Sequence, residues 1–278
     1  DQGFETYDDH VSADPGRLFI SERSGGDTSR QAIKWLDNRG REPFFLFLHY
    51  FDPHAKHDPP EPFTSRFLDA PYAGEIAYTD HCIGQVIEKL KSLGIYDSTL
   101  LVITSDHGES LGEHEEDTHG YFIYQSTIRV PFIIKAPGCA SQRKLDGPVS
   151  IVDVVPTVLG LSGITSPPQL DGKDLSRLLF EEGEPAHRYV YCESLWPTKY
   201  GCNGLFGLVH DRWKYIWTTR PELYDLMRDP DETTNLADKE FEIAGELQAQ
   251  LRKMLIQRVR TDVVDGALDL DSQSVERL

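Results

Sequence analysis

Long apolar runs and amphipathic stretches alternate along the first half of the chain. Residues 43–54, PFFLFLHYFDPH, form a continuous apolar run of strand length that ends in polar residues. Such a run is typical of a strand covered on both faces, although periodicity alone leaves a buried helix open. Residues 75–94 carry apolar side chains at helical spacing and end at Gly94, and residues 98–104, STLLVIT, form a second buried run. A strand, a crossover helix and a second strand predict a βαβ unit within a parallel sheet.

The pattern changes in the second half of the chain. Residues 130–138 still predict a buried strand and residues 152–163 a helix. Four short, aromatic, β-rich segments separated by turn formers then predict an antiparallel sheet: RYVYCES, LFGLVHD, RWKYIWT and ELYDL. Residues 241–259 form one amphipathic helix. We therefore predict an α/β domain over residues 1–184, with a mostly parallel sheet flanked by helices, and a small antiparallel-sheet subdomain with a packed helix over residues 185–278.

Composition and charge restrict the class of partner. The 278 residues are 39% hydrophobic and 27% charged, which is ordinary for a globular protein, and the formal net charge is −18. Such an acidic chain is not expected to bind nucleic acid or an anionic membrane surface, because phosphate binding needs clustered Lys and Arg. No apolar run approaches the roughly 18 residues that a membrane span requires.

The four cysteines show no CxxC pairing, so a zinc site or a thioredoxin-like redox motif is not indicated. Cys192 and Cys202 could form a disulfide in an oxidising compartment, and the sequence leaves this open.

Ionisable side chains gather where two predicted strands end. Asp106 and His107 follow the second buried run, and His54 follows the first. In an open α/β sheet, ligands bind outside the carboxyl ends of the strands. A carboxylate beside an imidazole suits a divalent cation, but at least two more ligands must come from elsewhere. The alternative is an Asp that caps a turn beside an exposed His.

The stretch between these residues and Gly120 is rich in acids and histidines. His119 is a candidate either for function or for loop structure, and His54 by itself could be a structural histidine. His57 and His114 are predicted to be solvated loop residues. The acids at residues 113–117 are expected to form a hydrated loop, because Asp and Glu are rarely buried unpaired.

Five blocks, in this order, resemble the sulfatases of the alkaline phosphatase superfamily, and the resemblance covers essentially the whole chain. The blocks are PFFLFLHYFDPH, YAGEIAYTDHCIGQVIEKLKSLGIYDSTLLVITSDHGESLGEHEEDTHG, RVPFIIKAPG, VDVVPTVLGLSGI…LDGKDL and WKYI…ELYDLMRDPDETTNLA.

The resemblance implies roles for four residues. Asp106 and His107 match metal ligands, for which Ca²⁺ is expected and Mn²⁺ or Zn²⁺ is possible. Many sulfatases carry Asp-Asn at this place, and Asp-His is found in the related phosphonate and phosphodiester hydrolases. His54 matches the histidine near the leaving group, and His119 falls where many members have a lysine that contacts the sulfate. The two roles could be exchanged between these histidines.

The resemblance also implies an absence. The family's nucleophile, a formylglycine made from cysteine, or a serine, lies with two further aspartate ligands upstream of every block seen here. We therefore expect the chain to be a C-terminal portion that is inactive alone, from an enzyme that hydrolyses a sulfate ester, possibly of a carbohydrate. A periplasmic or extracellular location is favoured by the same resemblance. We also expect an uncovered face at FFLFLHYF or LLVIT. The alternatives are a phosphonate monoester or phosphodiester hydrolase of this superfamily, and a non-catalytic binding module.

Overall fold

The structure, a computed structural model, describes residues 3–11, 22–39, 42–139, 142–181, 183, 185 and 187–258. The chain divides into two compact units, Asp1–Thr99 and Leu100–Leu278, which are treated separately below. This division differs from the boundary between residues 184 and 185 suggested by the sequence pattern, and that assignment of domains stays a prediction.

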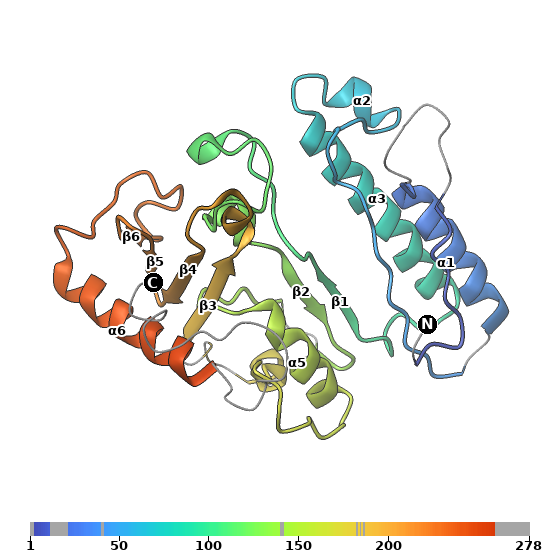
Figure 1. The fold of residues 1–278 in the computed structure, drawn as a ribbon. Coiled ribbons are helices and arrows are strands. Elements are labelled where there is room, and N and C mark those ends of the chain that lie inside the picture. Colours follow the sequence, from blue (N-terminus) through green and yellow to red (C-terminus); the bar gives the residue numbers. More distant parts are fainter. Residues whose placement is uncertain are drawn as a thin grey trace. The chain divides into compact units, whose positions relative to one another are not determined.

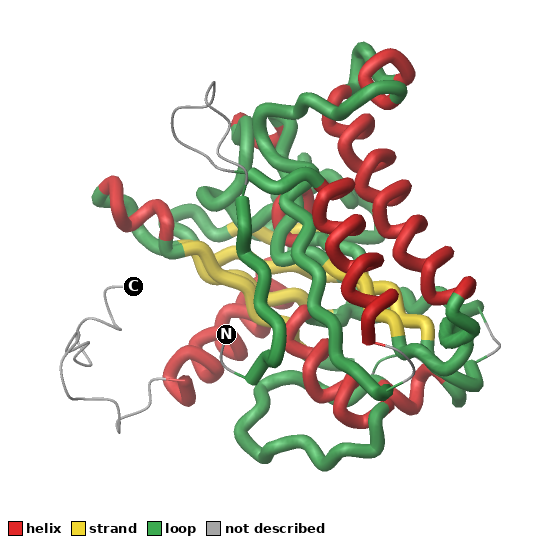
Figure 2. The backbone as a smooth tube through the Cα atoms, turned by 90° about the vertical axis from the view of Figure 1, so that its right-hand side faces the viewer, coloured by secondary structure: helices red, strands yellow, loops and turns green. Residues whose placement is uncertain are grey.

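Two long helices dominate the first unit. Helix α1 (Gly25–Arg39) and helix α3 (Pro71–Ser92) lie side by side, with the short α2 (Phe63–Arg66) next to the start of α3 (Figure 1, Figure 2). Their shared core is built from apolar residues four apart on each helix: Ala32, Leu36, Val86 and Leu90. Helix α3 agrees with the sequence prediction, whereas α1 was not predicted.

The apolar run at residues 43–50 differs from the expectation. Phe44, Leu46 and Leu48 pack against the core of α1 and α3, while Phe45 and Phe47 are 67% and 69% exposed. This alternation is typical of a half-buried extended segment with one uncovered face, and such a face was expected here. The described residues of this run belong to no sheet, so the predicted parallel βαβ pairing is not observed.

The second unit begins with a two-stranded antiparallel sheet. Strand β1 (Leu101–Thr104) pairs with β2 (Phe132–Lys135), and Thr104 lies opposite Phe132 (Figure 1). The segment between the two strands carries the acids and histidines singled out above. The remaining helical elements before the second sheet are η1 (Glu113–Glu115), α4 (Gln125–Ile128), η2 (Ile151–Asp153), α5 (Val154–Leu161) and η3 (Ser176–Leu179).

A four-stranded antiparallel sheet of order β3-β4-β5-β6 follows, as predicted. Its elements, with the 3₁₀ helix in the β3–β4 connection, are β3 (Tyr189–Ser194), η4 (Trp196–Tyr200), β4 (Leu205–His210), β5 (Trp213–Trp217) and β6 (Glu222–Asp225). Helix α6 (Phe241–Arg258) covers one face through Leu247 and Leu251 (Figure 1). Ile123 packs on Ile216 and Tyr224, in a separate core cluster.

The segment that precedes β2 is thus held on the C-terminal sheet by burial of Ile123. Full burial of one such side chain contributes roughly 1.5–3 kcal/mol. No described helix has the length and apolar character needed to cross a membrane. The predicted class, an α/β fold of the sulfatase kind with a small C-terminal antiparallel sheet, is confirmed by the structural similarities given below.

Candidate active site

The turn after β1 presents Asp106 and His107 together. The His107 backbone N–H donates to Asp106 Oδ1 at 3.0 Å, and the Ser105 hydroxyl donates to the His107 carbonyl at 2.7 Å. His107 Nδ1 lies 2.8 Å from the Gly108 carbonyl, a contact that requires the ring proton on Nδ1. In that tautomer His107 Nε2 carries a lone pair, and it lies 3.6 Å from Asp106 Oδ2.

This arrangement fits part of a cation site. Metal-binding histidines commonly donate their second ring N–H to a carbonyl, as His107 does to Gly108. A carboxylate oxygen and an imidazole nitrogen 3.6 Å apart can contact one ion. In the described part of the chain, however, no group of three or more His, Cys, Asp or Glu side chains is placed to hold a metal. Asp106 and His107 therefore supply two ligands of an incomplete set.

His119 lies against the same turn. Its ring stacks on the His107 ring, with centroids 3.9 Å apart and planes 28° apart. His119 Nδ1 lies 3.1 Å from Glu109 Oε2, and the Glu109 side chain is almost fully buried. Three of the four predicted site residues are thus adjacent, and Glu109 orients one of them. Glu109 was missed from the sequence, where only its place three residues after Asp106 could have signalled it.

Gly108 lets two turns approach each other closely. Its N–H donates to the Thr127 carbonyl at 2.7 Å. A Cβ atom at residue 108 would lie 2.2 Å from the Ser126 carbonyl oxygen, which is far inside van der Waals contact. The glycine is therefore required by this approach, and it fixes the Asp106–His107 turn against α4.

The acidic loop is more ordered than predicted. Glu116 is buried, and its Oε1 accepts the backbone N–H groups of Tyr121 and Phe122 at 2.8 and 3.3 Å. His114 stacks on the Tyr124 ring with centroids 3.6 Å apart, and its Nε2 lies 3.0 Å from the Asp231 carbonyl. The prediction of a merely hydrated loop is wrong for these two residues, because local backbone donors and an aromatic ring satisfy them.

His54 belongs to the first unit, where Glu75 organises its loop. The buried Glu75 carboxylate accepts the backbone N–H of His54 at 3.2 Å and that of Asp58 at 2.8 Å, and lies 3.0 Å from His57 Nδ1. His57 is therefore paired, and not a solvated loop residue as predicted. His54 Nδ1 lies 2.7 Å from the Ala55 carbonyl, so a proton given to a leaving group would come from Nε2 of the doubly protonated ring.

Burial affects a second carboxyl group in this loop. It raises the pKa of Asp52 above its ordinary range, although the Gly25 N–H donates to Asp52 Oδ2 at 2.6 Å. In the second unit, Cys192 and Cys202 are free thiols, so the disulfide left open by the sequence is not formed in the structure.

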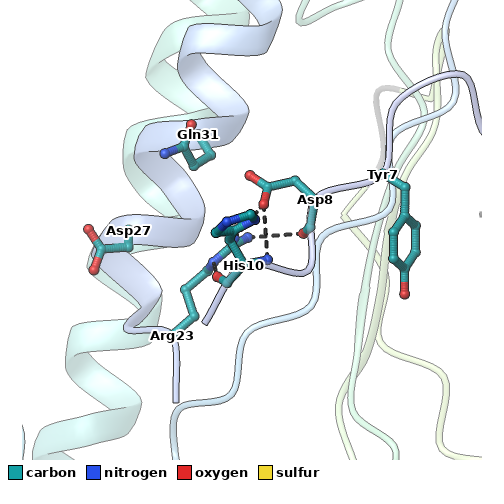
Figure 3. Close-up of a pocket in the computed structure, with 6 residues that line it drawn as sticks. All are labelled: Tyr7, Asp8, His10, Arg23, Asp27 and Gln31. Atoms are coloured by element: carbon teal, nitrogen blue, oxygen red, sulfur yellow. Dashed lines mark hydrogen bonds and ion pairs between the residues drawn. The ribbon is translucent and has the colours of Figure 1, made fainter. Parts of the chain in front are cut away.

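A cavity of about 490 Å³ in the first unit is lined by none of the predicted site residues (Figure 3). Its lining residues are Tyr7, Asp8, His10, Arg23, Asp27 and Gln31. The Arg23 guanidinium donates to Asp8 Oδ1 at 2.6 Å and to the His10 carbonyl at 2.7 Å. Because this arginine is already satisfied and two carboxylates line the cavity, it does not suit an anionic ligand.

Comparisons with known proteins agree with the sequence resemblance. The family model "Sulfatase" matches residues 3–164, and the model "N-sulphoglucosamine sulphohydrolase, C-terminal" matches residues 112–261. Arylsulfatase K of Mus musculus is 32% identical over 66% of this chain and 35% of its own length. The ulvan-active sulfatase of Formosa agariphila is 33% identical over 66% of this chain and 38% of its own length. The chain thus spans little more than a third of these relatives.

Solved structures share the fold. The protein yidJ of Bacteroides fragilis has a TM-score of 0.75 at 23% identity, covering 85% of this chain and 59% of that one. A phosphonate monoester hydrolase from Silicibacter pomeroyi has a TM-score of 0.68 at 25% identity, covering 86% and 61%. A protein solved with its substrate D-glucosamine-2-N,6-O-disulfate has a TM-score of 0.58 at 26% identity, covering 70% and 42%.

Proposed function

The chain belongs to the sulfatase family, and we propose that it carries part of the active site of a sulfuric ester hydrolase that releases inorganic sulfate. The observation that carries the proposal is the cluster at the end of β1. There Asp106, His107, Glu109 and His119 combine a carboxylate–imidazole pair with a second imidazole oriented by a buried acid. Such a group can bind a cation and a sulfate oxygen at one place.

Each residue has a role in this proposal. Asp106 and His107 hold a divalent cation, for which Ca²⁺ is the family expectation, and the imidazole ligand also suits Mn²⁺ or Zn²⁺. The bound ion supplies positive charge to the sulfate oxygens. His119, held by Glu109, donates a hydrogen bond to the sulfate, and His54 protonates the departing alcohol oxygen. The attacking group is a formylglycine that this chain does not contain, together with the remaining ligands of the ion.

We propose a sulfated carbohydrate as the substrate. Two similar proteins support this, because one is named for activity on ulvan and another was solved with a disulfated glucosamine. The proposed location is the periplasm or the cell exterior, where such polymers occur.

Hydrolysis of phosphonate monoesters is the second candidate. The Asp106–His107 pair in place of Asp-Asn favours it, as does the similarity to a phosphonate monoester hydrolase. Turnover of 4-nitrophenyl sulfate and of 4-nitrophenyl phenylphosphonate by the complete enzyme separates the two. The first proposal requires the larger kcat/KM for the sulfate, and the opposite order would replace it by the second.

The role of His54 is tested through the leaving group. In the complete enzyme, His54→Ala should slow esters of poor leaving groups by roughly 10²- to 10⁴-fold, because their departing oxygen needs a proton. It should slow 4-nitrophenyl sulfate much less. His81→Ala, an exposed histidine of α3 in the same unit, is the matched control and should leave both rates unchanged within about threefold.

Equal losses on both kinds of ester for His54→Ala would move this residue to sulfate binding, and His119 would become the proton donor. The 278-residue chain alone should hydrolyse neither ester, since it has no group to attack sulfur. Robust turnover by this chain would overturn the mechanism.

A further inference from the structure

Aromatic side chains gather beside the proposed sulfate site, on the connection between β3 and β4. Trp196 and Tyr200 flank the 3₁₀ helix η4 and are 44% and 62% exposed, and Tyr121 is 37% exposed. The Tyr121 and Tyr200 rings lie 5.7 Å apart. Lys199 Nζ lies 3.5 Å from the centre of the Trp196 ring. We call Tyr121, Trp196, Lys199 and Tyr200 the aromatic platform.

The platform is ordered by its own contacts. The Tyr200 hydroxyl is hydrogen-bonded to Tyr121, which raises the pKa of Tyr200, and it also has a side-chain hydrogen bond with Trp196. Pro197 is buried and anchors η4 beneath the exposed rings. Three large aromatic side chains are therefore held partly in water although burial would stabilise them, and a group of this kind on a surface commonly marks a binding site.

The platform is directly connected to the proposed active site. Tyr121 is two residues from His119 in the chain. The Ser194 hydroxyl at the end of β3 donates to the carbonyl of Gly120, which joins the β3–β4 connection to the segment that carries His119. A ligand whose ester group lies at His119 would therefore extend onto these rings if it were longer than one small group.

The chemistry of the platform favours one kind of occupant. Aromatic faces pack against the apolar C–H faces of a pyranose ring, while hydroxyl groups at their edges bind its polar rim. The ammonium of Lys199 attracts a carboxylate or sulfate on that ring, within a chain whose net charge of −18 otherwise repels anions. The cation–π contact with Trp196 keeps this ammonium at the aromatic surface.

We propose that the aromatic platform is a saccharide subsite that binds the anionic pyranose next to the sugar ring carrying the ester. This inference rests on the proposed function, because it extends the substrate from the same site. It makes the enzyme selective for oligosaccharides over small sulfate esters, which end before they reach the platform.

Kinetics of the complete enzyme test the subsite with two substrates. One is 4-nitrophenyl sulfate, and the other is whichever of heparin, chondroitin 4-sulfate or ulvan tetrasaccharides it desulfates fastest. Trp196→Ala should raise KM for the tetrasaccharide about tenfold, with kcat within about twofold, as loss of one stacking contact predicts. Trp196→Phe should restore most of this loss, and KM for 4-nitrophenyl sulfate should not change. Phe241→Ala, an exposed aromatic residue of α6, is the control and should affect neither substrate.

A saccharide KM that is insensitive to Trp196→Ala, or an equal change for both substrates, would overturn the subsite and leave the proposed function standing. If the complete enzyme releases no sulfate from any ester, the proposed function fails instead. In that case calorimetry of the 278-residue chain with the three tetrasaccharides decides about the platform. Binding that is lost in Trp196→Ala supports it, and no binding overturns it. Dimerisation of the chain that is lost in Trp196→Ala, measured by sedimentation, would identify the platform as a protein interface and overturn the proposal.

Discussion

A buried ion pair connects the C-terminal sheet to the segment that carries His119, and its removal gives a sharp stability prediction. Lys214 of β5 and Glu232 are almost inaccessible to solvent, with Nζ and Oε1 2.6 Å apart. Glu232 Oε2 also accepts the backbone N–H of Gln125, the first residue of α4. Replacing Lys214→Met keeps an apolar chain of similar length but leaves the Glu232 carboxylate buried without its cation.

The expected cost follows from this burial. Removal of one member of a buried ion pair destabilises a protein by about 3–5 kcal/mol, because the remaining charge loses its partner and cannot reach water. The total stability of a typical domain is only about 5–15 kcal/mol. Replacing both members is far milder, so the double variant Lys214→Met/Glu232→Gln should be more stable than Lys214→Met by at least about 2 kcal/mol. Its amide oxygen can still accept the Gln125 N–H.

Urea unfolding followed by tryptophan fluorescence is the assay, because Trp213 and Trp217 lie on the same strand as Lys214. The matched double variant Lys214→Met/Glu232→Leu has no charge and no acceptor for Gln125, and should lose a further 1–3 kcal/mol or so relative to the Gln version. Amide exchange at Gln125 should rise only in the Leu version. A cost below about 1 kcal/mol for Lys214→Met, or a Gln double variant no more stable than that single one, would refute the reasoning.

Three further outcomes are expected. Calorimetric titration of the chain with Ca²⁺, Mn²⁺ and Zn²⁺ should show nothing tighter than roughly micromolar affinity, since the turn after β1 supplies two ligands; nanomolar binding would contradict the incomplete set. Gly108→Ala should lower the thermal midpoint, because its Cβ meets the Ser126 carbonyl, whereas Gly84→Ala in the open middle of α3 should raise it; equal effects would contradict the close approach. Burial raises the pKa of Cys192 from 9.0 to about 11, so the folded state keeps a proton that the unfolded chain loses between these values. Stability should therefore fall on the order of 2 kcal/mol more between pH 9 and 11 in the native protein than in Cys192→Ala, and parallel curves would argue against a buried thiol.

Part of the candidate site was predictable because it depends on local order in the chain. Asp106 and His107 follow a short apolar strand directly, so their adjacency needed no tertiary information, and His119 was reached through the resemblance. Glu109 and Glu116 were not recognised as ordered, because a carboxylate in an acidic loop looks the same in sequence whether it is solvated or buried. Only the folded loop shows that His119 and the backbone of Tyr121 approach them.

The sequence by itself determined the elements whose signal is periodic: helix α3, helix α6 and the four strands from β3 to β6 all lie where apolar spacing and turn residues predicted them. Only the tertiary structure decided the pairing of β1, which is antiparallel to β2, and the half-exposed state of residues 43–50. An apolar run records that a segment can be buried, but not which partner buries it, since strand pairing and face coverage depend on segments far away in the chain. The aromatic platform has the same origin, because Tyr121 and Tyr200 come together only when β3 lies against the segment that follows His119.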